Sequence, residues 1–173
     1  MVNNTKLFQI GSFNFKLHHF AVIGILLLSF SISYTIKSQP LDYANELNEF
    51  DPFFNFRATE YLVENGFSQY FEWHDDKSWY PTGRNVSATS QTMLHITAAI
   101  SYEIFGGNSS LYDFTIFFPL AIASLSVFVI FALVRLFGGT TAGLISSLLI
   151  AISLPIAVRA MAGWFKSDTL GIF

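Results

Sequence analysis

Long apolar runs separated by one long polar stretch organise the sequence. Residues 20–36 and 114–134 contain no charged residue, and neither does the run 140–158. A helix that crosses a bilayer needs about 20 predominantly apolar residues, with a lower limit near 17. The pattern therefore predicts transmembrane helices at 20–36, 114–135 and 140–158. The Gly138-Gly139 pair makes the last two an antiparallel hairpin.

A fourth stretch, residues 89–105, has apolar positions close to a helical period. It also carries Gln91, His95 and Glu103, which are costly inside hydrocarbon. We therefore expect an amphipathic helix that lies within an external loop. The number of crossings depends on this interpretation. If 89–105 does not span, the loop 37–113 and the segment 159–173 emerge on the same side of the membrane, and if it spans they emerge on opposite sides.

Charge fixes the expected orientation. Residues 1–19 contain Lys6 and Lys16 and no acidic residue, so the positive-inside rule predicts a cytoplasmic N-terminus. A cleaved signal peptide is the alternative for 20–36, but no cleavage motif follows Ile36 and an uncleaved anchor is favoured.

Composition narrows the class further. The chain is 52% hydrophobic and only 12% charged, against about 25% charged residues in soluble domains. The net charge of -3 argues against a nucleic-acid partner, and the absence of cysteine excludes thiolate chemistry. These features indicate an all-α polytopic membrane protein.

The start of the loop carries the first candidate chemistry, Glu49-Phe50-Asp51-Pro52. One interpretation is structural, with Asp51 as the N-cap of a helix that ends at Gly66. In the functional interpretation, residues two apart in an extended segment point the same way, so Glu49 and Asp51 direct oxygens to one place. Paired carboxylates suit a hard divalent cation, Mg²⁺ or Mn²⁺.

A second polar block runs from Trp73 to Arg84. Its Asp75-Asp76 pair is either a second metal pair or a solvated turn, and the turn is favoured. Trp79 and Tyr80 either stack on sugar rings or lie at the membrane interface, and the interface is favoured. The histidines of the loop, His74 and His95, have no metal-ligand spacing, and we expect structural roles for them.

The chain resembles the N-terminal part of the catalytic subunit of oligosaccharyltransferase, of the archaeal type. The resemblance is carried by residues 49–59, by 73–84 around Trp79-Tyr80-Pro81-Thr82-Gly83-Arg84, and by 159–163, which precede an acidic motif. It implies a C-type glycosyltransferase-like fold with a large first external loop. It implies a metal-dependent enzyme that transfers an oligosaccharide from a lipid-(pyro)phosphate carrier to the asparagine of N-x-S/T sequons.

The resemblance also implies roles for particular residues. Asp51 matches a catalytic aspartate that binds Mn²⁺ or Mg²⁺ and the acceptor amide, and Glu49 matches the first acid of that motif. Arg159 matches an arginine that supports Asp51. Asp168 matches the second acidic motif and is expected to be a metal ligand.

The expected substrate-binding residues are Trp79, Tyr80, Arg84 and Lys166. Lys166 departs from the family pattern, because relatives have an acidic ligand there. A charged ammonium cannot bind a metal, so the alternatives are that Asp168 acts alone, that Lys166 turns away, that the metal site is weak, or that Lys166 contacts the pyrophosphate.

The expected partners are a dolichyl-phosphate type oligosaccharide, an acceptor polypeptide and membrane lipid, and the expected location is the cell membrane with the site facing outward. Relatives are several times longer, so we expect an inactive fragment. Two alternatives remain: a protein mannosyltransferase type of enzyme, and a non-catalytic membrane protein or transporter.

Overall fold

The computed structural model describes residues 6–10 and 13–173. Helices dominate it, and the short strands form two separate antiparallel hairpins. In chain order the elements are β1 (Lys6–Ile10), β2 (Phe13–Lys16), α1 (Leu17–Ser38), η1 (Gln39–Asp42), α2 (Phe50–Glu72), β3 (His74–Asp75), β4 (Arg84–Asn85), α3 (Val86–Thr89), α4 (Thr92–Phe105), α5 (Leu111–Ile152), α6 (Leu154–Val158) and α7 (Asp168–Ile172).

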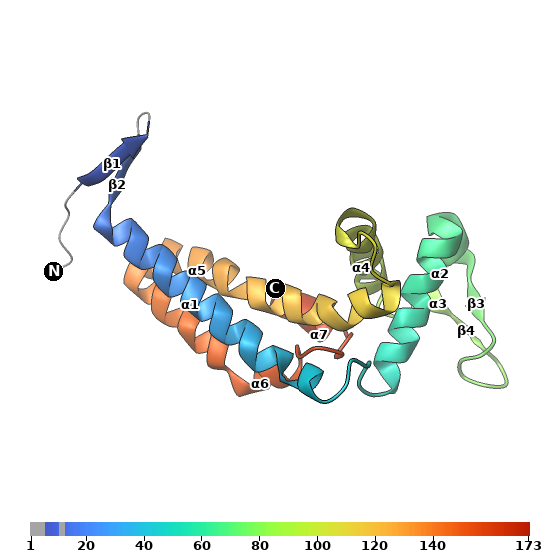
Figure 1. The fold of residues 1–173 in the computed structure, drawn as a ribbon. Helices are drawn as coiled ribbons and strands as arrows, with labels where there is room; N and C mark the ends of the chain where they lie inside the picture. The colour runs from blue at the N-terminus through green and yellow to red at the C-terminus, as the bar shows by residue number, and fades with distance from the viewer. Residues whose placement is uncertain (1–5, 11–12) are drawn as a thin grey trace.

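The long axis of the molecule is built from α1 and α5, which lie side by side (Figure 1). Both are long and apolar enough to cross a membrane. The backbone of α5 leaves the helical conformation at Gly139, where φ is 76°. Residues other than glycine rarely adopt this backbone conformation. Gly139 therefore divides α5 into two helical legs. The segment of the chain predicted as 20–36 lies within α1, and 114–135 lies within the first leg.

The expected third span, 140–158, is interrupted. The second leg of α5 ends at Ile152, and the short helix α6 begins at Leu154 after an extended Ser153. Pro155 explains the break, because it has no amide hydrogen to donate within a helix and fits only its first turn. The predicted cytoplasmic segment 1–19 lies partly outside the described residues, and its β1–β2 hairpin was not predicted.

The segment 37–113, which the sequence predicts to be an external loop and which is called the external loop below, folds mainly into a small helical unit at the end of α1 and α5 that lies farthest from the β1–β2 hairpin (Figure 1). There α2 packs against α3 and α4. The stretch predicted as a helix at 89–105 begins at the last residue of α3 and contains the whole of α4. One core lies within this unit: Ala58, Leu62, Tyr70, Val86 and Ala99. A second core joins the unit to α5 and to the segment after α6: Leu47, Leu94, Ala98, Ile116, Phe118, Leu120, Ala162 and Phe165.

The prediction that Asp51 caps a helix is wrong. The N-cap is Glu49, α2 begins at Phe50, and no side chain makes the capping hydrogen bond. Asp51 lies in the first turn instead, followed by Pro52, whose missing amide hydrogen costs nothing because the first amides of a helix have no intrahelical acceptor. The backbone of α2 does leave the helical conformation at Gly66, as predicted, and a further helical turn follows.

Candidate functional site

The two acidic segments of the sequence meet beside the second core. The Lys166 ammonium lies 2.8 Å from Oε2 of Glu49 and 3.0 Å from Oδ2 of Asp51. The side chain of Lys166 is 15% exposed, whereas that of Asp51 is 71% exposed. The carboxylates therefore face solvent, and the cation that joins them lies beneath.

The charge of Lys166 is stabilised by these partners. Burial alone lowers the pKa of Lys166, but the hydrogen bonds and negative charges of Glu49 and Asp51 outweigh burial and raise that pKa above its ordinary value. The Nζ atom also lies 4.5 Å from the ring centroid of Trp164, within range of a cation–π interaction. Lys166 is a fixed positive charge at neutral pH.

Backbone contacts bring the first acidic motif to the segment after α6. Glu49 has φ of 70°, a left-handed conformation that is strained for a residue with a side chain. Asn48 donates its backbone amide to Gly163 O (3.0 Å) and its side-chain amide to Ala162 O (3.0 Å). These long-range bonds hold Glu49 in place against its local preference. Strain of this kind is concentrated at functional sites.

Asp168, the acidic residue of the second motif, begins α7 and pairs with a different basic side chain. Its Oδ2 lies 3.5 Å from Nη1 of Arg159 and 3.5 Å from Nε1 of Trp164. The resemblance implies that Arg159 supports Asp51, but the ion pair that Arg159 makes in the structure is with Asp168. Each acidic motif therefore faces a basic side chain.

A buried chain of side-chain hydrogen bonds, which was not predicted from the sequence, connects the interior of the loop to the segment that carries Lys166. The hydroxyl of Tyr70 lies 2.6 Å from Nδ1 of His95, and Nε2 of His95 lies 3.0 Å from Oδ1 of Asn55. Asn55 donates its Nδ2 to Phe165 O at 2.8 Å. Because the Asn55 oxygen can only accept, His95 donates from Nε2 and accepts from Tyr70 at Nδ1.

This chain of bonds links α2 and α4 to the residue before Lys166. Burial lowers the pKa of His95 to about 3, so the imidazole is neutral. The expectation that His95 is structural agrees with this position. No periodic pattern could have identified Asn55 or Tyr70, because their partners lie 25 residues or more away.

A small polar cavity adjoins Asp51. Its volume is about 150 Å³, and Arg84 lines it together with Asn55 and Gln91. The Arg84 guanidinium lies 3.7 Å from the centroid of the Phe54 ring and 4.9 Å from that of Trp79. Of the expected substrate-binding residues, the structure thus brings Arg84 and Lys166 near Asp51, whereas Tyr80 is almost fully exposed.

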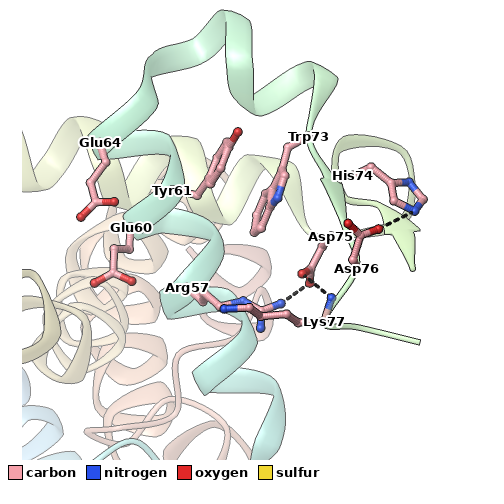
Figure 2. A pocket seen from close by; sticks show the side chains of 9 residues that line it. All are labelled: Arg57, Glu60, Tyr61, Glu64, Trp73, His74, Asp75, Asp76 and Lys77. Atoms are coloured by element: carbon pink, nitrogen blue, oxygen red, sulfur yellow. Dashed lines mark hydrogen bonds and ion pairs between the residues drawn. The ribbon is translucent and has the colours of Figure 1, made fainter. Parts of the chain in front are cut away.

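A larger hollow of about 410 Å³ lies farther along α2 (Figure 2). The rings of Tyr61 and Trp73 stack within it, 4.1 Å apart at 6°. Asp75 is buried there and bonds to Arg57 and Ser78, whereas Asp76 is exposed. Asp75 and Asp76 point to different partners in Figure 2, so they are neither a metal pair nor a simple solvated turn.

The described side chains offer poor coordination for a divalent ion. Within residues 6–10 and 13–173, no group of three or more histidine, aspartate or glutamate side chains is arranged to hold a metal. Asp51 and Asp168 already face Lys166 and Arg159. Of the alternatives for Lys166, the one in which its side chain turns away from the acidic motif does not agree with these contacts.

Together, these features define an all-α polytopic membrane protein whose external loop carries an acidic site. The chain belongs to the family described as "Oligosaccharyl transferase STT3, N-terminal", whose model matches residues 15–173. The resemblance to the N-terminal part of the oligosaccharyltransferase catalytic subunit is confirmed, and so is the fold class.

Curated relatives include glycosyltransferase subunits of plants. The chain is 29% identical to a dolichyl-diphosphooligosaccharide–protein glycosyltransferase subunit STT3A of Oryza sativa subsp. japonica, over 88% of this chain and 19% of the relative. It is 30% identical to a subunit STT3B of Arabidopsis thaliana, over 98% of this chain and 24% of the relative. The chain thus spans about a fifth of the length of these relatives.

Solved structures show the same fold. The archaeal oligosaccharyltransferase AglB from Archaeoglobus fulgidus, in complex with an inhibitory peptide and a dolichol-phosphate, has a TM-score of 0.71 at 21% identity, over 88% of this chain and 18% of that chain. A structure of the Archaeoglobus fulgidus oligosaccharyltransferase in complex with zinc and sulfate has a TM-score of 0.66 at 21% identity, over 84% and 19%. A divalent metal is thus present in a structural relative.

Proposed function

We propose that the full-length protein transfers an oligosaccharide from a lipid-(pyro)phosphate carrier to the asparagine of N-x-S/T sequons, and that this chain supplies the acidic part of its active site. The observation that carries the proposal is the meeting of Glu49 and Asp51 with Lys166, 117 residues away from Glu49, in a member of this family.

The chemistry explains why carboxylates are needed. The amide nitrogen of asparagine is a poor nucleophile, because its lone pair is delocalised into the carbonyl group. An exposed carboxylate such as that of Asp51 accepts hydrogen bonds from the amide N–H groups and orients the nitrogen. The nitrogen then bonds to the anomeric carbon of the sugar while the bond from that carbon to the phosphate oxygen breaks. The amide proton passes to a base, and the lipid-(pyro)phosphate leaves.

The partners and location follow from the same proposal. The donor is a dolichyl-phosphate type lipid, in line with the dolichol-phosphate in a structural neighbour, and the acceptor is a polypeptide with a sequon. Arg84 lines the cavity beside Asp51 and contributes positive charge for the phosphate-bearing donor. The site faces the exterior of the cell membrane.

The predicted Mn²⁺ or Mg²⁺ at Asp51 and Asp168 does not fit the described side chains as they lie. Zinc in a structural neighbour shows that a relative holds a divalent metal, but here both carboxylates have basic partners. The transfer step proposed above therefore uses no metal.

The test is transfer to a fluorescent sequon peptide by the full-length protein in membranes with its lipid-linked donor. Asp51→Ala should lower the rate by about 100-fold or more, because it removes the group that orients the amide. Asp42→Ala, which removes an exposed carboxylate from the same loop, is the matched control and should retain the rate. Equal rates for Asp51→Ala and Asp42→Ala would refute the proposal.

A further inference from the structure

We propose that the ammonium of Lys166 is the resident cation of the first acidic motif, in the place where the sequence predicts a divalent metal. The inference rests on the proposed function only for its effect on transfer. Its structural content is that Glu49 and Asp51 are held together by a covalently attached positive charge and take up no divalent ion.

The geometry of Lys166 is that of a cation in a site. Its Nζ lies within hydrogen-bond distance of one oxygen of Glu49 and one oxygen of Asp51, which come from residues two apart in the chain. An ammonium has three donors and no acceptor, so two of its three hydrogens are used by these carboxylates. The ring of Trp164 covers another side of the ammonium. Carboxylates and an aromatic face are what a buried cation requires.

The charge count opposes a further cation at the pair. Glu49 and Asp51 contribute two negative charges, and Lys166 cancels one of them at 2.8 and 3.0 Å. A divalent ion bound to the same two oxygens would lie a few ångströms from the ammonium and be repelled by it. The third carboxylate, Asp168, is offset by Arg159 at 3.5 Å. The two basic residues thus take the place of the two charges of one divalent ion.

The position of Lys166 also leaves the site open to an acceptor. The ion pair uses only Oδ2 of Asp51, whose side chain is mostly exposed. The Lys166 side chain lies beneath the carboxylates rather than over them. The ammonium can therefore fix the direction of the Asp51 carboxylate while its other oxygen accepts an amide hydrogen.

The experiment measures Mn²⁺ binding to the purified full-length protein by electron paramagnetic resonance, with no substrate present. The wild-type protein and Asp51→Asn should show the same Mn²⁺ binding, because the wild-type protein has no saturable Mn²⁺ site at Asp51. Lys166→Asp should raise Mn²⁺ affinity at this site by about 100-fold or more, because it replaces a repulsive charge by an oxygen ligand. The double variant Lys166→Asp with Asp51→Asn should lose that gain.

Two further variants separate charge from folding. Lys166→Arg keeps the positive charge and should bind no more Mn²⁺ than the wild type. Lys166→Met and Lys77→Met each remove one positive charge from the external side, and only Lys166→Met should gain Mn²⁺ binding. Two results would overturn the inference. The first is saturable Mn²⁺ binding by the wild-type protein that is lost in Asp51→Asn. The second is a folded Lys166→Asp protein whose Mn²⁺ affinity equals that of the wild type.

Transfer activity provides a separate readout. If the inference holds, the transfer rate of the wild-type protein should not change on treatment with a chelator, whereas that of any active Lys166→Asp protein should fall and recover with Mn²⁺. A protein that transfers no oligosaccharide but shows the expected Mn²⁺ results would contradict the proposed function and leave this inference standing. A chelator that abolishes wild-type transfer would contradict the inference and the metal-free transfer step, but not the transfer reaction itself.

Discussion

The burial of His95 makes the folding stability of the external loop depend on pH. Its pKa is lowered to about 3 in the folded protein, against 6.5 when unfolded. Below pH 6.5 the unfolded chain therefore binds a proton that the folded chain excludes, and folding stability falls as pH falls. We expect a loss of about 1.4 kcal/mol per pH unit at most between pH 6.5 and 3.

The measurement is the thermal unfolding midpoint of the protein in detergent as a function of pH. His95→Gln keeps a polar side chain but cannot titrate, so it should flatten the slope between pH 6 and 4 even if it lowers stability overall. Gln69→Ala, at an exposed position of the same loop, is the control for substitution itself and should leave the slope as it is in the wild type. An equal slope for wild type and His95→Gln would rule out His95 as the cause.

The Arg57–Asp75 ion pair is the clearest stabilising contact of the hollow in Figure 2. Asp75 is 3% exposed and also accepts from Ser78 and from the backbone amide of Lys77. Asp75→Ala should therefore cost about 3 kcal/mol of unfolding free energy, since it leaves buried donors without an acceptor. Asp76→Ala, at a neighbouring side chain that is 88% exposed, should change it by no more than about 0.5 kcal/mol. Denaturant unfolding followed by tryptophan fluorescence distinguishes them.

At the scale of elements, backbone hydrogen bonds of Gly163 hold the segment after α6 close to the external loop. It accepts from Asn48 and donates to Ile116 O at 2.9 Å. An added Cβ would collide with Glu46 O and lie 2.8 Å from Asn48 Nδ2. Gly163→Ala should therefore displace Lys166 from its carboxylates and lower the unfolding free energy.

Gly66 is a matched control for this prediction. Gly66 and Gly163 both have φ of 79°, but nothing lies within 4 Å of a Cβ added at Gly66. Gly66→Ala should cost about 1 to 2 kcal/mol from backbone strain alone, and Gly163→Ala about 2 kcal/mol more from the collision. Equal losses in chemical denaturation would show that the close approach at Gly163 does not matter.

The sequence predicted elements better than it predicted contacts. Apolar runs are local signals, so the positions of α1, of the first leg of α5 and of α4 could be inferred from them. The start of α2 was misplaced, because the positive φ of Glu49 is imposed by Asn48 and its distant partners. The break at Ser153 follows from Pro155, which is visible in the sequence but lies inside an uncharged run long enough for one span.

At the scale of the molecule, the candidate site shows the same limit. The residue types of Glu49, Asp51 and Asp168 predicted an acidic site, and the roles of these residues remain a proposal. The residue that joins the first two is Lys166, and its direction could not be inferred from an alignment of motifs. The chain of Tyr70, His95 and Asn55 left no local pattern, because each bond joins different elements.

The distribution of charge along the long axis argues for one orientation in the membrane. The start of α1, which follows Lys16, and the break at Gly139, which follows Arg135, lie at the same end of the long axis (Figure 1). The acidic loop lies at the opposite end (Figure 1). Positive residues favour the cytoplasmic side, so we predict that Glu49, Asp51 and Asp168 lie outside.

Single cysteines test this orientation, because the 173 residues contain none. Tyr43→Cys and Asn108→Cys lie at exposed positions before and after the external helices, and Phe137→Cys lies at an exposed position beside the break in α5. An impermeant maleimide added to intact cells should label the first two and not the third, and all three after permeabilisation. If α4 crossed the bilayer, Tyr43→Cys and Asn108→Cys would be labelled from opposite sides, and the two acidic motifs could not share one site. Labelling of both from outside would therefore support the orientation that the transfer reaction requires.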